Sequence, residues 1–196
     1  MLFAVLDTAL TALRDAAAGV PADALDNATP CSAWTVAQVL LHAAGDQHAW
    51  AATAGDGAFP AYNPFDPPHS LDVSVQDAVA GASDAATAAW ARIDGDDVST
   101  PLPPVPTLPA DLAVAACALD AAVHAWDVAV ATGQPSPLTP ALAEQLMPAA
   151  RATAEPLRGF AYAAPLEPQP GDDAAATLLR YLGRDPQWHP AREERG

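Results

Sequence analysis

Apolar side chains recur at three- and four-residue steps in several separate segments of this sequence, which is the spacing of one face of an α-helix. In the first segment, residues 2–18, the recurring residues are Leu2, Val5, Leu6, Leu10 and Leu13. Similar patterns predict further helices over residues 36–53, 72–93, 110–131, 138–156 and 172–183. No long Val-, Ile- and Thr-rich segment alternates between apolar and polar residues, as a half-buried strand would. The pattern therefore predicts an all-α protein.

Proline and glycine separate these segments. Residues 54–69 contain two glycines and four prolines, which predicts a long loop, and long loops are often functional or mobile. Residues 95–109 contain Gly95 and five prolines, which excludes a helix but allows a short extended excursion. The tail over residues 185–196 is expected to fray. Long helices joined by such connections favour an antiparallel bundle with the later segments packed on its outside.

Charge and cysteine content exclude several classes of function. The 196 residues carry a net charge of −16, and eight arginines supply all the basic side chains. Nucleic acids and anionic membranes bind clustered cations, so we expect neither as a partner. Two cysteines, Cys31 and Cys117, do not make a disulfide framework, and neither a signal peptide nor a membrane-spanning run is recognisable. We expect one cytoplasmic domain over residues 1–196, with residues 160–196 as an extension packed on it or partly flexible.

Two histidines are distinguished by their positions in the predicted helices. His42 lies in the helix over residues 36–53, on the flank of its apolar face, and His124 follows Asp120 by four residues in the helix over residues 110–131. Residues four apart project from the same side of a helix, so Asp120 and His124 can bind one ion together. Two imidazoles and one carboxylate are the ligands of open zinc sites, and they also suit iron or nickel. The sequence therefore predicts one divalent ion held by His42, Asp120 and His124.

The polar residues near this triad have functional and structural interpretations. Asp127 either orients a metal ligand from behind or is an ordinary surface acid. Cys117 is either a fourth ligand, a reactive thiol or, more commonly for such a residue, a small buried side chain. His48 lies about 120° around its helix from His42, so we interpret it as a surface or groove-lining residue. The site as a whole also has an interpretation without a metal, in which the polar groups pair with one another inside the bundle.

Several stretches together resemble a known family. Residues 29–36 (TPCSAWTV) and 40–45 (LLHAAG) resemble the N-terminal signature of the mycothiol-dependent maleylpyruvate isomerase-like proteins, which belong to the DinB-like superfamily of actinobacterial metal-binding bundles. Residues 123–129 (VHAWDVA) and 131–133 (ATG) are similar to the second signature of this family. Residues 178–186 (LLRYLGRDP) are similar to the C-terminal ending of one uncharacterised branch. The resemblance covers nearly the whole chain in order.

The resemblance implies a fold and a metal site. It implies an up-down-up-down four-helix bundle with a metal at one end, and it matches His42, Asp120 and His124 to the ligands of the family. The isomerase often has glutamate where this chain has Asp120, so the metal distance and the metal can differ. The isomerase also has a separate C-terminal domain, which this chain is too short to contain in full. Maleylpyruvate is therefore not the substrate we expect.

Two classes of function follow from the resemblance and the residues. The first is a metal-dependent isomerase or S-transferase in which the metal, most commonly zinc, activates mycothiol for attack on a small electrophile. The alternative is a non-catalytic metal-binding protein that binds a small hydrophobic ligand or a thiol conjugate, with the loop over residues 54–69 and the tryptophans lining its pocket. A homodimer formed through the faces of the bundle is compatible with both.

Overall fold

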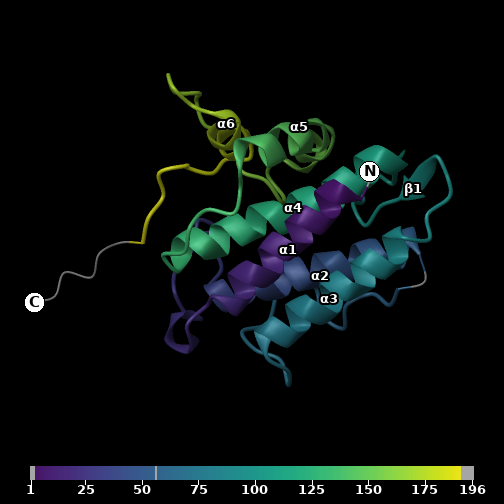
Figure 1. Ribbon diagram of the computed structural model, residues 1–196, viewed down its shortest axis with the longest axis horizontal. Helices are drawn as coiled ribbons and strands as arrows, with labels where there is room; N and C mark the ends of the chain where they lie inside the picture. Colours follow the sequence, from purple (N-terminus) through teal and green to yellow (C-terminus); the bar gives the residue numbers. More distant parts are fainter. Residues whose placement is uncertain (1–2, 56, 191–196) are drawn as a thin grey trace, which may run out of the picture.

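The computed structural model describes residues 3–55 and 57–190, and within these ranges the chain is mostly helical (Figure 1). The described α-helices are α1 (Ala4–Ala18), α2 (Val36–Ala54), α3 (Val75–Trp90), α4 (Ala110–Ala131), α5 (Pro140–Ala154) and α6 (Ala174–Tyr181). Two short 3-10 helices, η1 (Ala22–Ala24) and η2 (Glu155–Leu157), lie between them. The sheet is a single antiparallel pair, β1 (Asp97–Ser99) with β2 (Thr107–Pro109). The predicted all-α class is confirmed, and the expected extended excursion is this hairpin.

Local sequence signals account for where the helices begin. A capping box is present at the start of α2: the Thr35 hydroxyl accepts from the Gln38 amide at 3.4 Å, and the Gln38 side chain accepts from the Thr35 amide at 3.2 Å. Ser74 and Thr139 cap α3 and α5 in the same way through their hydroxyl oxygens. Position 2 and residues 191–196 lie outside the described residues, and with them lie the predicted helix start at Leu2 and part of the predicted frayed tail.

The first four helices form a bundle, and buried residues of α5 and α6 extend its hydrophobic core. In the packing of these helices, α1 contacts α3 and α4, and α2 also contacts α3 and α4, so that α1 and α2 lie diagonally opposite each other. Figure 1 shows α1 in front of α2, with α4 above and α3 below. Many of the buried positions are alanine, and four named examples in α4 are completely buried: Ala113, Ala118, Ala121 and Ala125. Small side chains let the helices approach closely.

The directions of the helices differ from the expected up-down-up-down order. A Cβ atom at Gly55, which follows α2, would lie 3.2 Å from Cβ of Ala89 near the end of α3, and the rings of Trp50 and Trp90 are 6.0 Å apart. The C-terminal ends of α2 and α3 therefore lie together, and these two helices are parallel. Gln134, just after α4, likewise donates to the carbonyl of Ala16 near the end of α1, at 3.0 Å. The order is up-down-down-up.

The connection between α2 and α3 makes this order possible, because it runs back along α2. The Gln38 side chain donates to the Pro67 carbonyl at 3.1 Å, and the Tyr62 hydroxyl donates to the Leu41 carbonyl at 2.6 Å. A Cβ atom at Gly45 would lie 2.9 Å from the ring of Pro64 and would clash with it. The predicted long loop is thus packed on the bundle, over the part of α2 that contains His42.

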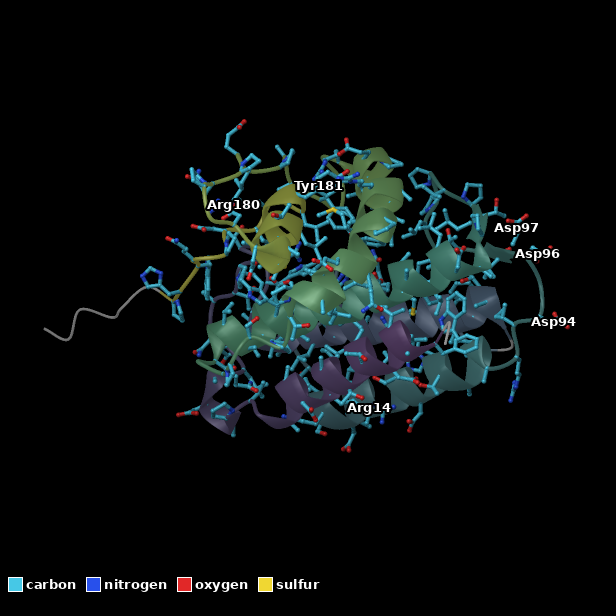
Figure 2. The ribbon with its side chains drawn as sticks, turned by 45° about the horizontal axis from the view of Figure 1, so that its top comes forward. Arg14, Asp94, Asp96, Asp97, Arg180 and Tyr181 are labelled. Carbon is cyan, nitrogen blue, oxygen red and sulfur yellow. The ribbon has the colours of Figure 1, made fainter. Side chains whose placement is uncertain are left out.

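The C-terminal segment packs on the outer side of α4. Helix α5 contacts α4, and α6 contacts α5 (Figure 1). Arg180 and Tyr181, labelled on α6 in Figure 2, help to hold this segment: Arg180 donates to Asp172 at 2.9 Å, and the Tyr181 carbonyl accepts from Arg158 at 2.8 Å. Among the described helices α4 alone has the length and apolarity of a membrane span, but 89% of its apolar window is buried inside the protein. It is the central helix of the core.

Candidate metal centre

The antiparallel helices α2 and α4 bring the three predicted ligands together. Asp120 Oδ1 lies 3.9 Å from His42 Nε2 and 3.5 Å from His124 Nε2. One ligand atom from each of the three residues lies within 4.8 Å of the others. The side chains of His42 and His124 are 7% and 9% exposed, and that of Asp120 is 12% exposed. The residues therefore form one nearly buried cluster of nitrogen and oxygen donors.

The hydrogen bonds of the two histidines leave the same ring nitrogen free. His42 Nδ1 lies 2.8 Å from the Pro64 carbonyl oxygen, and His124 Nδ1 lies 2.9 Å from Asp127 Oδ2. Because a carbonyl and a carboxylate only accept, both Nδ1 atoms carry the proton. Both Nε2 atoms then have an unshared electron pair, and both face Asp120. Metal-binding histidines are usually held in this way: one ring nitrogen binds the metal, and the other donates its proton to an oxygen.

Burial keeps the imidazoles neutral. Desolvation lowers the pKa of His42 and of His124 below the ordinary value, although Asp120 partly offsets this effect for both rings. Neutral imidazole is the form that binds metal ions. Without a cation, the cluster has buried nitrogen lone pairs that face a carboxylate. A divalent ion fits this donor set, since it supplies the positive charge that the group lacks.

Asp127 is a fully buried acid that supports His124. Its side chain is 0% exposed, and it accepts from Arg184 Nε at 2.9 Å on Oδ1 and from Arg184 Nη2 at 2.8 Å on Oδ2. Burial alone would raise the pKa of Asp127, but Arg184 and His124 hold this pKa well below its ordinary value. Of the two predicted interpretations of Asp127, the structure supports the one in which it orients His124.

A second cluster of possible metal ligands consists of Cys31, His124 and Asp127. Arg184 already supplies a cation here, because its Nη2 contacts both Asp127 Oδ2 and, at 3.4 Å, Cys31 Sγ. Burial and the nearby Asp127 raise the pKa of Cys31 far above its ordinary value, so this sulfur is a thiol and not a thiolate. The thiol donates to Asp127 at 3.2 Å. The cluster is therefore satisfied internally and does not need an ion.

Asp46 is a further acid at the site that the sequence analysis missed. It follows His42 by four residues on α2, and its Oδ2 lies 3.7 Å from His42 Nε2. Burial raises the pKa of Asp46 to about 7 and that of Asp120 to about 6. The same four-residue spacing that identified Asp120 and His124 on α4 would have found it. Each helix thus contributes one histidine and one aspartate to the site.

Gln47 fixes the far side of Asp120. Its Nε2 donates to Asp120 Oδ2 at 3.1 Å, and its Oε1 accepts from the Cys117 thiol at 3.1 Å. Cys117 is completely buried, and burial raises its pKa well above the ordinary value. Among its predicted roles, the structure favours the small buried residue. His48 points away from the triad and lines a separate hollow beside Tyr62, in agreement with its interpretation as groove-lining.

A cavity of about 200 Å³ opens in front of the triad. Its floor contains His42, Asp46, Asp120 and His124. Its walls are mostly apolar and come from four parts of the chain: Trp34, Phe65 and Leu102, then Leu157, Phe160, Ala161 and Tyr162. A reactant can therefore reach the candidate ligands, as an open metal site requires. Tryptophans and the loop over residues 54–69 were predicted to line a pocket, and Trp34 and Phe65 do so, whereas the contribution of residues 157–162 was not predicted.

Fold and site together define an α-helical bundle that presents two histidines and an aspartate at the bottom of an open pocket. The comparison with known families agrees with this description. The family described as "Mycothiol maleylpyruvate isomerase N-terminal domain" matches residues 6–129, from α1 almost to the end of α4. The chain belongs to this family. The match includes all three predicted ligands but ends before Phe160 and Arg184.

Two proteins of Mycobacterium tuberculosis, both described as uncharacterized, are similar to this chain. One comes from strain H37Rv and the other from strain CDC 1551 / Oshkosh. Each is 35% identical over an alignment of 173 residues that covers 83% of this chain and 88% of the relative. The similarity therefore extends beyond the part that the family covers, into the C-terminal segment. No solved structure shows significant similarity to the chain.

Proposed function

We propose that this protein binds one divalent metal ion through His42, Asp120 and His124 and uses it to activate a low-molecular-weight thiol for reaction with a small electrophile. The observation that carries the proposal is the pair of Nε2 lone pairs that face a buried carboxylate, with both Nδ1 protons already engaged. The family match supports a thiol-dependent reaction and makes mycothiol the thiol we propose. A reduced thiol pool is a property of the cytosol, so we place the reaction in the cytoplasm.

A divalent ion held by His42, Asp120 and His124 would lower the pKa of a coordinated thiol, so that the thiolate would be present at neutral pH. The protein supplies the remaining conditions. Pro64 and Asp127 hold the imidazoles in one orientation, Gln47 holds Asp120, and the walls of the pocket are mostly apolar. In an S-transfer, the thiolate sulfur forms a bond to the electrophilic carbon and the leaving group departs with the electron pair of the broken bond. In an isomerisation, the sulfur adds and is later eliminated, so that the thiol is recovered unchanged.

Three ligands from the protein leave room for the thiol, and zinc is the ion we propose because it accepts two imidazoles, one carboxylate and a sulfur in tetrahedral geometry. Nickel and ferrous iron suit the same nitrogen and oxygen donors. The shorter reach of Asp120, compared with a glutamate, does not prevent its oxygen from approaching both Nε2 atoms within 3.9 Å.

Metal content and thiol binding test this proposal. The wild type and the His124→Ala variant would be purified without added metal and analysed by mass spectrometry for bound metal. His48→Ala is the matched control, because it removes a histidine from α2 that does not face the triad. We expect about one ion per chain in the wild type and in the control, and far less in His124→Ala. The cobalt-substituted protein would then be titrated with mycothiol, and a change in the cobalt spectrum is expected. An unchanged spectrum would contradict thiol activation, and equal metal in all three proteins would contradict the ligand assignment.

A further inference from the structure

Aromatic rings from separate parts of the chain form the outer rim of the pocket. Phe65 belongs to the connection between α2 and α3, whereas Phe160 belongs to the turn after η2. Their ring centroids are 5.0 Å apart, with a tilt of 45°. The ring of Phe65 also lies 5.9 Å from that of His42, and Trp34 lies 4.5 Å from His42 on another side. A row of rings therefore leads from the surface to one of the candidate ligands.

Phe160 is highly exposed although its backbone is fixed. Its relative exposure is 68%, one of the highest among the large apolar residues that the structure describes. The turn that carries it is closed by the Gly159 amide, which donates to the Tyr162 carbonyl at 2.9 Å, and by Arg158, which donates to the Ala163 carbonyl at 2.8 Å. Gly159 has a φ of +77°, which favours glycine at this corner. The protein thus holds an apolar ring in water at the entrance of a pocket.

The charges around the pocket disfavour a negatively charged group at its entrance. Asp46 and Asp120 lie on the floor, and among the lining residues Arg184 is the one with a permanent positive charge. Its Nε and Nη2 already donate to Asp127, which neutralises much of its charge. An anion between the rings would therefore face two acids, and in the metal-free protein no free positive charge among the described lining residues would offset them.

The volume of the cavity limits what it can enclose. A cavity of about 150 Å³ lined by apolar side chains is large enough to bind benzene. The pocket here measures about 200 Å³, so it accepts a group of about the size of one six-membered ring together with a few attached atoms. Larger parts of a reactant remain outside, over the rim.

We propose that Phe65 and Phe160 bind an uncharged, planar, apolar group, such as an aromatic ring or a conjugated alkene, and that this group is the hydrophobic part of the electrophilic substrate. Aromatic pairs favour the tilted and offset arrangements that this rim already shows, and a third ring between them would cover the exposed face of Phe160. The proposal rests on the proposed function only for the statement that the reacting end of the substrate lies at the triad.

Binding of two small probes to the metal-free protein tests the inference apart from any metal chemistry. Benzyl alcohol and benzoate have nearly the same size and shape, but only benzoate is charged. Saturation-transfer NMR titrations at pH 7.5 would measure both, in the wild type, in Phe160→Ala and in Phe59→Ala. Phe59 is the matched control, because it is 65% exposed but lines the separate hollow beside His48. Both variants change exposed side chains, so both are expected to fold.

We expect benzyl alcohol to bind the wild type with a dissociation constant of about 1 mM, and benzoate to bind about tenfold more weakly or not at all. Phe160→Ala should weaken the binding of benzyl alcohol about three- to tenfold, because one aromatic pair is lost, whereas Phe59→Ala should leave this binding unchanged. Equal or tighter binding of benzoate would overturn the inference, as would equal binding by Phe160→Ala and the wild type. If the protein binds a metal ion but not benzyl alcohol, this inference alone is refuted. If it binds benzyl alcohol but no metal ion, only the proposed function is refuted.

Discussion

Replacement of Arg184 by methionine tests the support behind the candidate ligand His124. Methionine keeps much of the apolar volume of the arginine side chain but removes the guanidinium, which makes a two-pronged contact with Asp127 at 2.8 to 2.9 Å. Asp127 is 0% exposed, so the variant leaves a buried carboxylate whose remaining described partners are His124 and the Cys31 thiol. Removal of one partner from a buried ion pair costs about 3–5 kcal/mol. This loss is a large part of the free energy of unfolding of a typical domain, which is about 5–15 kcal/mol.

The assay is urea unfolding of the metal-free protein at pH 7, followed by far-ultraviolet circular dichroism. Arg14→Met is the matched control: Arg14, labelled on α1 in Figure 2, contacts Asp84 at 2.5 Å, and the Asp84 side chain is 73% exposed. Such surface pairs contribute about 0–1 kcal/mol. We expect Arg184→Met to lower the free energy of unfolding by about 3–5 kcal/mol with an unchanged dependence on urea, and Arg14→Met by less than about 1 kcal/mol.

A second substitution separates the loss of charge balance from the loss of packing. In Arg184→Met combined with Asp127→Asn, the buried group at position 127 is neutral and its amide oxygen can still accept from His124 Nδ1. We expect the double variant to be more stable than Arg184→Met alone, since it no longer contains a buried unpaired charge. A loss below about 1 kcal/mol in Arg184→Met, or a double variant that is less stable than the single one, would refute the reasoning.

Three further predictions concern pH, backbone strain and thiol reactivity. Because the folded-state pKa of Asp46 is raised to about 7, folded protein binds more protons than unfolded protein between the ordinary value and pH 7, and its stability falls as pH rises through that window. The free energy of unfolding of Asp46→Asn, relative to that of the wild type, should therefore rise by up to about 4 kcal/mol between pH 4 and pH 8. Urea unfolding with a chelator present would measure it, and a difference between the two proteins that does not change with pH would contradict the prediction. Gly183→Ala should cost about 1–3 kcal/mol more than Gly133→Ala in thermal unfolding, since both glycines have positive φ but only a Cβ at Gly183 would clash, at 2.8 Å from Cβ of Ala163. Cys31 and Cys117 should resist iodoacetamide at pH 7.5 in native protein and react in urea, as counted by mass spectrometry, and rapid native labelling would show that they are accessible.

Short-range spacing accounts for what the sequence predicted well. The step of four residues between Asp120 and His124 depends only on helix geometry, and the apolar periodicity depends only on residues within one helix. The direction of α3 could not be predicted in this way, because the long connection after α2 can return to either end of the bundle. Contacts such as those of Tyr62 with Leu41 fix the direction, and they are visible only after folding.

Long-range contacts explain the rest of the site. Arg184 lies 57 residues after Asp127, and no periodicity links these two positions. The proton on His42 Nδ1 depends on a carbonyl 22 residues away, at Pro64. Asp46 is the exception, because its spacing from His42 was available in the sequence. A search for histidine and aspartate four residues apart on every predicted helix would have identified it.

X-ray absorption spectroscopy of the purified protein at the edge of its bound metal tests the central claim most directly. We expect an ion bound by His42, Asp120 and His124 to be surrounded by nitrogen and oxygen only, at about 2.0–2.2 Å for zinc, with the additional scattering signature of two imidazole rings. Addition of mycothiol should then introduce one sulfur at about 2.3 Å. A sulfur ligand before any thiol is added would place the ion at Cys31, His124 and Asp127 instead and would contradict the assignment to His42, Asp120 and His124.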